Sequence, residues 1–260
     1  MLLTCSTTVC PELPLKEALA FVRQAGFSRI ELFRTHTEST PVHPDLSVRM
    51  VRQYLQEAEI ELSGFNIRNL TGRKADSDER NPAYNLRQLE WDINLARALG
   101  LSTVNLKGGA RTDEAMEDLR EGLPKLLERF ADITFNLGNH LDNRLQGLTD
   151  YQTALEGLDE RVQVLMDTGP LLATGQDIMA FAQALAGRIG LVHLRDQQGG
   201  KPVPFGQGDL PFEPLLRLLH EAGYQGYLVI ELEEVDWDQP LAAASAARHY
   251  TEELLARIKT

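Results

Sequence analysis

The sequence is poor in cysteine, with only Cys5 and Cys10 among its 260 residues. A chain of this length that depended on disulfide bonds would normally use more of them. It contains no CxxC motif, so no thiolate zinc site of the usual spacing is supported. We therefore expect two free thiols in a reducing compartment.

The chain also lacks the segments that mark export or membrane insertion. The N-terminus, Met-Leu-Leu-Thr-Cys-Ser, has no basic region followed by an apolar core, and no apolar run approaches the ~20 residues that span a bilayer. Basic residues are outnumbered, 26 against 38 acidic ones, and the formal net charge is -12. A field of that sign disfavours nucleic acids and anionic membranes as partners. We predict a cytoplasmic protein that binds neither.

Glycine-rich phosphate-binding motifs are missing as well. No GxGxxG or GxxxxGK[ST] occurs where an expected strand leads into a helix, and the first such turn, residues 6–11, contains no glycine. A doubly wound sheet that binds nucleotides is therefore not supported. No GxSxG is present either, so a nucleophile elbow of the hydrolase kind is not supported.

What the sequence does contain is a regular alternation of short apolar runs and amphipathic segments. Residues 14–25, for example, place Leu15, Ala18, Leu19 and Val22 at helical spacing. Eight such units over a length near the ~250 residues typical of the fold predict one (β/α)8 TIM barrel domain over residues 1–260. The expected strands are 2–6, 29–33, 61–67, 103–107, 133–137, 162–167, 189–195 and 227–231, and the expected helices are 14–25, 45–58, 83–99, 113–129 (with Pro124 kinking or splitting it), 150–158, 177–186, 212–222 and 241–258.

Three of the expected strands end on residues that can bind a metal. Asp167, His193 and Glu231 each follow an aliphatic run. In a barrel the C-terminal ends of the strands meet at one face, and period-2 alternation selects the side chains that point inward. Two carboxylates and an imidazole suit Mn²⁺, Mg²⁺ or Zn²⁺. We predict a divalent metal at these three residues; the alternative is three solvated strand ends.

Other polar residues fall at the same face and are candidates for substrate binding. Arg68, Lys107 and Arg195 would form a local basic cluster on an acidic chain, which favours an anionic ligand. The alternative is surface cations or ion pairs, and Arg195 has Asp196 as a neighbour. The full set of predicted substrate-binding residues is Asn66, Arg68, Lys107, Arg195 and, on a loop over the mouth, Trp237.

Five fragments, in order, resemble one known family. They are Gly26-Phe-Ser-Arg-Ile-Glu-Leu32, Asp167-Thr-Gly169, His193-Leu-Arg-Asp196, Gly206-Gln-Gly-Asp209 and Val229-Ile-Glu231. Together they resemble the xylose-isomerase-like superfamily of TIM barrels, which holds sugar isomerases, ketose epimerases, inosose dehydratases and apurinic-site endonucleases. The resemblance implies that Asp167, His193 and Glu231 are metal ligands and that Glu231 also acts as an acid or base.

The chain departs from this family at two positions. The family usually has Glu-Asn-His in strand five, whereas this chain has Gly138-Asn139-His140, and Pro170 stands where the family commonly has a histidine. Loss of one carboxylate should weaken the binding of a hard dication, although three ligands can still hold a catalytic metal. His140 shares the inward face with Gly138 and is a candidate fourth ligand or acid/base.

The residues and the resemblance together predict a metal-dependent isomerase or epimerase. It would act on a small sugar, sugar phosphate or polyhydroxy acid by proton transfer next to a polarised carbonyl, with Glu231, His140 and Glu31 as acid/base candidates. The alternatives are a dehydratase of the same superfamily, or a barrel that binds a sugar or organic acid without catalysis. An endonuclease fits poorly, because Pro170 removes a ligand and the net charge opposes DNA. The family also suggests a homo-oligomer.

Overall fold

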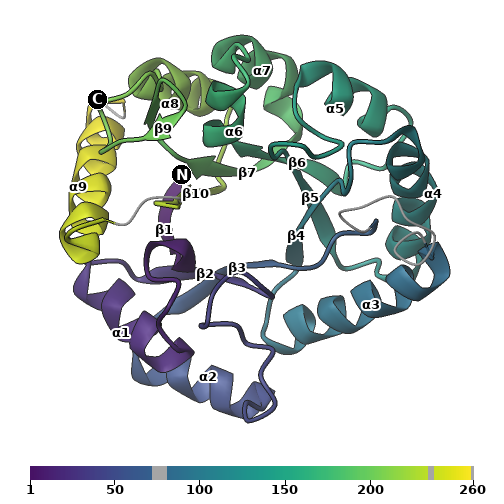
Figure 1. Ribbon diagram of the computed structural model, residues 1–260, viewed down its shortest axis with the longest axis horizontal. Helices are drawn as coiled ribbons and strands as arrows, with labels where there is room; N and C mark the ends of the chain where they lie inside the picture. Colours follow the sequence, from purple (N-terminus) through teal and green to yellow (C-terminus); the bar gives the residue numbers. More distant parts are fainter. Residues whose placement is uncertain (72–80, 234–236, 259–260) are drawn as a thin grey trace.

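The computed structural model describes residues 1–71, 81–233 and 237–258, and its centre is a closed barrel of parallel strands (Figure 1). Each barrel strand pairs with a neighbour on both sides, in the order β1-β10-β7-β6-β5-β4-β3-β2. The single (β/α)8 barrel predicted from the alternation of segments is therefore confirmed. Its strands are β1 (Leu2–Ser6), β2 (Arg29–Phe33), β3 (Glu61–Asn66), β4 (Thr103–Lys107), β5 (Thr134–Gly138), β6 (Val162–Asp167), β7 (Ile189–Leu194) and β10 (Tyr227–Ile230).

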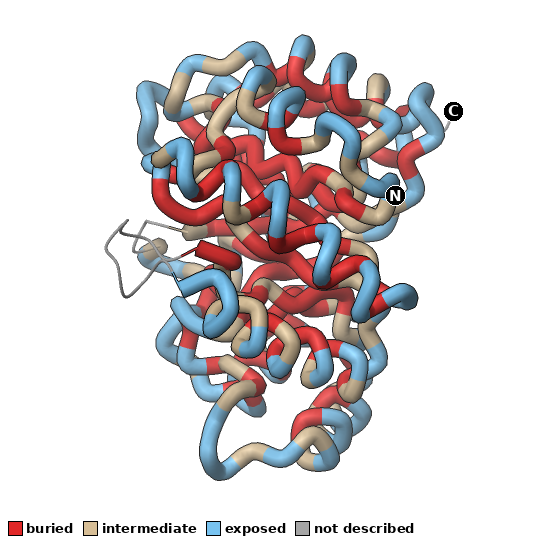
Figure 2. Tube along the Cα trace, turned by 90° about the vertical axis from the view of Figure 1, so that its right-hand side faces the viewer, coloured by how far each residue is buried: buried red, intermediate tan, exposed pale blue. Residues whose placement is uncertain are grey.

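A ring of helices surrounds the barrel (Figure 1). The long helices bury apolar residues in one core with those of the strands. In the first of them Leu15, Ala18, Leu19 and Val22 are all buried, as their spacing predicts. Figure 2 shows the resulting buried layer between the barrel and the exposed outer faces of the helices. No helix in the described ranges combines the length and apolarity needed to cross a bilayer. The long helices are α1 (Leu15–Gln24), α2 (Val48–Glu57), α3 (Pro82–Ala98), α4 (Asp113–Arg129), α5 (Leu148–Leu155), α7 (Ile178–Leu185), α8 (Phe212–Glu221) and α9 (Pro240–Ile258).

Local signals fix where most of these helices begin and end. The side chains of Ser47, Thr112 and Asp177 accept the backbone N–H three residues on and so cap α2, α4 and α7. After α1 the chain turns at Gly26, whose φ of 91° is open to glycine but strained for other residues. Helix α4 runs through Pro124 without a break, so Pro124 does not split it, and the kink stays a prediction.

Short elements of the chain were not predicted. These are η1 (Thr7–Val9), α6 (Thr168–Ala173), η2 (Ala186–Arg188), and the two-residue strands β8 (Gln197–Gln198) and β9 (Lys201–Pro202). None is long enough to show a periodic pattern. Helix α5 begins two residues earlier than expected, because the Asp150 carboxylate accepts the N–H groups of Gln146 and Gly147 and draws the chain into the helix.

The inside of the barrel is partly polar. Leu165, Leu191 and Val229 form a small apolar cluster there, separate from the main core between the strands and helices. Elsewhere in the barrel side chains bond one another, as between the hydroxyl oxygens of Thr4 and Ser63, which lie 2.6 Å apart. The candidate site therefore rests on a polar floor rather than on a fully apolar core.

Candidate metal centre

Strand register brings the three predicted metal-binding residues together. Asp167, the last residue of β6, is the register partner of His193 in β7, and His193 is the partner of Val229 in β10. Glu231 follows two residues after Val229, and its N–H donates to the carbonyl of Leu194 at 3.2 Å. One ligand atom from each of the three buried side chains lies within 4.8 Å of the others. Three adjacent strands thus present two carboxylates and an imidazole to one point.

This donor set fits a divalent metal in type and spacing. Carboxylate oxygen and imidazole nitrogen are ligands for Mn²⁺, Mg²⁺ and Zn²⁺. The ring nitrogen of His193 that faces away from Glu231 lies 2.9 Å from Oε1 of Glu31. A carboxylate behind a ligand imidazole is a common way to orient that ring in metal sites.

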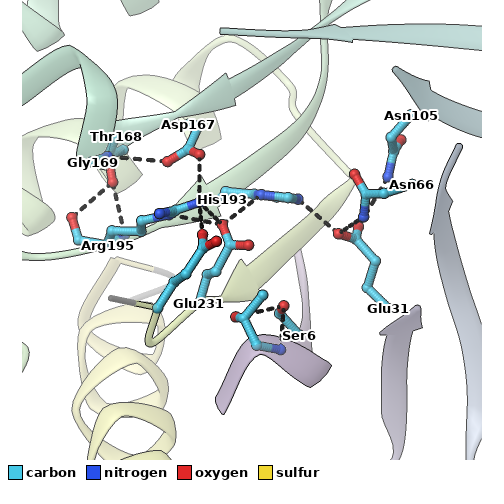
Figure 3. A network of polar contacts seen from close by, with 12 residues as sticks. Ser6, Glu31, Asn66, Asn105, Asp167, Thr168, Gly169, His193, Arg195 and Glu231 are labelled. Atoms are coloured by element: carbon cyan, nitrogen blue, oxygen red, sulfur yellow. Dashed lines mark hydrogen bonds and ion pairs between the residues drawn. The ribbon is translucent and has the colours of Figure 1, made fainter. Parts of the chain in front are cut away.

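His193 lies between two carboxylates (Figure 3). Its Nδ1 is 2.8 Å from Oε2 of Glu231, and its Nε2 faces Glu31. Burial lowers the pKa of a histidine, but the two carboxylates outweigh burial and raise the pKa of His193 well above its usual value. Without a metal, His193 is therefore an imidazolium that links the two acids.

Glu31 is fully buried and held by amides. It accepts hydrogen bonds from Nδ2 of Asn66 at 2.6 Å and from Nδ2 of Asn105 at 3.1 Å. A Cβ at position 64 would lie 2.7 Å from the Glu31 carboxylate, so Gly64 leaves room for it. Glu31, predicted as an acid/base, thus sits behind His193 and positions that ring.

Arg195 is the central cation of the site. Its Nη2 lies 3.0 Å from Oδ2 of Asp167, 2.8 Å from Oε2 of Glu231 and 2.6 Å from Oε2 of Glu233, and its side chain is 6% exposed. Its Nε donates to the same Glu231 oxygen at 2.8 Å. Gly169 allows this approach, because a Cβ there would lie 2.6 Å from the Arg195 side chain.

The structure places Arg195 in ion pairs, as the alternative expected, but its partners are Asp167, Glu231 and Glu233 rather than its neighbour Asp196. The buried Asp196 carboxylate instead accepts the backbone N–H groups of Gly206, Gly208 and Leu210. Asp196 therefore folds the loop after β7, while Arg195 turns into the barrel.

The two carboxylates of the centre differ in their affinity for protons. Burial raises the pKa of Asp167 to about 6, although Arg195 opposes the rise. Burial would raise the pKa of Glu231 too, but Arg195 and His193 outweigh it and hold that pKa well below its usual range. Glu231 is thus the firmly ionised member, since it receives the most donors.

A polar cavity of about 500 Å³ lies beside the centre. Lys107, His140 and Glu233 line it, together with Asn66 and Asn105. Burial lowers the pKa of Lys107, and burial followed by the charge of Lys107 lowers the pKa of His140. Within the described part of the chain, the cavity lining does not include Asp167, His193, Arg195 or Glu231. The residues that line the cavity therefore separate it from the centre.

Arg68 and Trp237 lie at the mouth with other partners. The guanidinium of Arg68 bonds the buried Asp92 carboxylate at 2.9 Å and Gln88 at 2.7 Å, so it is held at the cavity edge. Trp237 donates from Nε1 to the carbonyl of Leu232 at 3.3 Å. Trp237 lines a second, more apolar cavity of about 670 Å³ rather than the polar one.

Two residues of the wall are not among the predicted site residues. His36 and Glu233 line both cavities, and Glu233 also binds Arg195. Period-2 spacing from Glu231 would have pointed to Glu233, but the expected strand ended at Glu231. His36 has a φ of 85°, a backbone conformation that no sequence pattern around it signals.

The two departures from the family lie on β5 and α6, next to the strand that carries Asp167. Gly138 is the register partner of Lys107, and a Cβ on it would meet the Leu165 side chain at 3.6 Å and the Leu106 carbonyl at 3.8 Å. The position therefore has space for a side chain. Pro170 lies in the first turn of α6, where a missing N–H is tolerated.

Comparison with known proteins finds relatives that match half or most of the chain. The chain is 28% identical over 165 residues to an inosose dehydratase of Clostridium perfringens, covering 54% of this chain and 55% of that protein. It is 26% identical over 259 residues to the L-ribulose-5-phosphate 3-epimerase UlaE of Escherichia coli, covering 93% and 90%. The chain thus spans about half of the dehydratase and nearly all of the epimerase.

Solved structures show the same fold. The crystal structure of the IOLI protein with a bound zinc atom superposes with a TM-score of 0.81 at 18% identity, covering 99% of both chains. The sequence model of a xylose isomerase-like TIM barrel matches residues 19–254 of this chain. The chain therefore belongs to the xylose isomerase-like TIM barrel family.

Proposed function

We propose that the protein is a metal-dependent isomerase or epimerase of a small sugar, sugar phosphate or polyhydroxy acid. The observation that carries the proposal is the convergence of Asp167, His193 and Glu231 beside a polar cavity at the mouth of the barrel. The similarity to a sugar phosphate epimerase over most of both chains supports it. The expected homo-oligomer stays a prediction.

Asp167, His193 and Glu231 would hold Mn²⁺, Mg²⁺ or Zn²⁺. A metal bound there would supply Lewis acidity that polarises a substrate carbonyl or hydroxyl. Glu31 keeps the His193 ring in place through its contact with Nε2, and Asn66 and Asn105 in turn hold Glu31.

The cavity offers the groups that a polyhydroxylated substrate needs. Amides of Asn66 and Asn105 line it and can bind hydroxyl groups. Lys107 provides a positive charge for a carboxylate or phosphate. The lowered pKa of His140 keeps its imidazole neutral near pH 7, so that it can accept a proton from carbon or oxygen.

A dehydratase is the second candidate, and Gly138 favours it. Exchange of a proton between two faces of a carbon works best with two acid/base groups, whereas elimination of water needs one base and a Lewis acid. The absence of a carboxylate side chain at Gly138 removes one such group from strand β5. Similarity to inosose dehydratases over about half of their length is in line with this alternative.

Solvent isotope exchange distinguishes the candidates. The metal-loaded protein is incubated in D₂O with L-ribulose 5-phosphate, L-ribulose, D-tagatose, D-psicose, hydroxypyruvate and inosose, and ¹H NMR follows carbon-bound protons. An isomerase or epimerase replaces a proton next to the carbonyl by deuterium, whereas a dehydratase converts inosose with loss of water. Exchange must disappear in Glu231→Gln. A metal-loaded protein that changes none of these compounds contradicts both candidates and leaves a barrel that only binds.

A further inference from the structure

Arg195 already contacts one oxygen of each carboxylate that a metal would need. Its Nη2 contacts Oδ2 of Asp167 and Oε2 of Glu231, two of the three candidate ligands. The Glu231 oxygen receives Arg195 Nε, Arg195 Nη2 and His193 Nδ1 together. The other Asp167 oxygen accepts the N–H of Gly169 at 3.1 Å. A dication bound to the same oxygens would lie next to a guanidinium, and like charges in a buried site repel strongly.

We propose that Arg195 is a built-in counter-cation of the metal centre. It neutralises Asp167 and Glu231 in the metal-free protein, and it must leave them before a divalent cation binds. Arg195 thus sets the metal affinity of this barrel. The inference rests on the proposed metal site, but its tests measure metal affinity and the solvent exchange of the Arg195 N–H group rather than turnover.

Glu233 gives the displaced guanidinium a place to go. Its carboxylate is the shortest partner of Arg195 Nη2, at 2.6 Å, and its side chain is 29% exposed. Because Glu233 lines both cavities, Arg195 can keep this ion pair while it turns towards the mouth. The metal ligands are almost fully buried behind the cavity wall, so the same movement would open them to a substrate.

Gly138 and Lys107 strengthen the case. Where the family would have a carboxylate, this chain has Gly138, and its register partner on β4 is a lysine. The charge of Lys107 acts on Asp167, Glu231 and Arg195. The centre therefore has fewer acids and more cations than a four-ligand site needs. A carboxylate cluster balanced in this way can persist without a metal, because each buried charge has a partner.

Metal titration of arginine variants tests the proposal. The protein is stripped with EDTA, dialysed and titrated with Mn²⁺, with free Mn²⁺ read by electron paramagnetic resonance. Arg195→Met should bind Mn²⁺ about tenfold or more tightly than the native protein, because the variant no longer places a positive charge beside the ligand oxygens. Arg195→Lys keeps the charge without the planar fork and should fall between the two.

Arg34→Met is the matched control. Arg34 also binds a buried carboxylate, that of Asp92 at 2.9 Å, but Asp92 belongs to helix α3 and is not among the candidate ligands. Its Mn²⁺ affinity should equal that of the native protein. In EDTA the Arg195→Met variant should also melt several degrees lower than the native protein, and Mn²⁺ should restore more of its Tm.

Nitrogen NMR of the native protein follows Arg195 itself. In protein labelled with ¹⁵N-arginine, the buried Nε–H of Arg195 should exchange slowly with solvent in EDTA, and Arg195→Lys assigns its signal. Saturating Zn²⁺ should shift the signal and speed its exchange. If Arg195 stays equally protected in the zinc-saturated protein, or if Arg195→Met leaves the Mn²⁺ affinity unchanged, the counter-cation role is wrong.

The outcomes separate this inference from the proposed function. Tight metal binding by the native protein that Arg195→Met does not alter refutes the counter-cation and leaves the metalloenzyme standing. Metal binding by Arg195→Met alone supports the counter-cation and refutes metal-dependent catalysis by the native chain. No binding by either protein refutes both.

Discussion

Gly138 is the single residue whose replacement should make the centre most like a four-ligand site. A side chain there has space, since its Cβ would make only ordinary contacts with Leu165 and the Leu106 carbonyl. Gly138→Glu should tighten Mn²⁺ binding about tenfold or more, because an added carboxylate raises the affinity for a hard dication. Gly138→Gln is the control, with the same volume and no charge. Equal Mn²⁺ affinities in the two variants would argue against a metal position within reach of β5.

Cys10 provides a test at the residue scale that is independent of metal. Both cysteines are buried and free, as the sequence predicts, and burial raises the pKa of Cys10 to about 12. The unfolded thiol ionises near pH ~8.5. Because the folded-state pKa is raised, the stability that Cys10 contributes is complete below that value and is lost as pH rises towards 12.

The free energy of unfolding should therefore fall between pH 8 and pH 10.5 in the native protein. In Cys10→Ala that fall should be smaller by about 2–3 kcal/mol. Urea unfolding at the two pH values gives the difference directly, and groups common to both proteins cancel. The same pH dependence in both proteins would mean that the Cys10 thiol is accessible to water.

At the scale of elements, one carboxylate organises the loop after β7. Asp196 accepts three backbone N–H groups from residues 206–210. Asp196→Ala should lower the free energy of unfolding by roughly 2–4 kcal/mol, because buried donors lose a charged acceptor. Asp209→Asn, in the same loop, should stay within about 0.5 kcal/mol. Urea unfolding measures both, and an Asp196→Ala loss no larger than that of Asp209→Asn contradicts this account.

The elements that sequence could predict are those with repeated apolar spacing. The strands and long helices fall within a few residues of their expected bounds, since burial on one face leaves a period in the sequence. The short helix α6 and the pair β8–β9 have no such period. They form because single carboxylates accept backbone hydrogen bonds. Asp167 caps α6, and Asp196 accepts N–H groups of the loop that follows it.

At the scale of the whole molecule, the barrel topology made the metal centre predictable from the sequence. The direction in which individual side chains point could not be predicted in the same way. Parallel strands in order guarantee that Asp167, His193 and Glu231 meet at one face. The direction of Arg195 could not be derived, because the nearer carboxylate in sequence, Asp196, is taken by backbone N–H groups. Likewise Glu31 has the inward direction expected from period 2, yet its place behind His193 follows from bonds to Asn66 and Asn105.

The centre also ties together the strands that close the barrel. Its residues come from β6, β7 and the end of β10, and β10 pairs with β1. A metal that binds only the folded barrel stabilises all of it, by roughly 2.7 kcal/mol at a hundred times its dissociation constant. For a chain of this size that should raise Tm by roughly 5–10 °C. Differential scanning calorimetry of the EDTA-stripped protein, with and without Mn²⁺, measures the rise.

Two matched variants decide where the stabilisation originates. Glu231→Gln removes a candidate ligand and should abolish the rise in Tm, whereas Glu233→Gln leaves the three candidate ligands in place and should keep a rise, though a smaller one because Arg195 loses its partner outside the ligand set. Both substitutions remove one negative charge from the surroundings of Arg195, so a general charge effect would change the two proteins alike. A Tm rise of the same size in Glu231→Gln would place the stabilising Mn²⁺ elsewhere on the acidic surface and leave the strands of the mouth without a metal to join them.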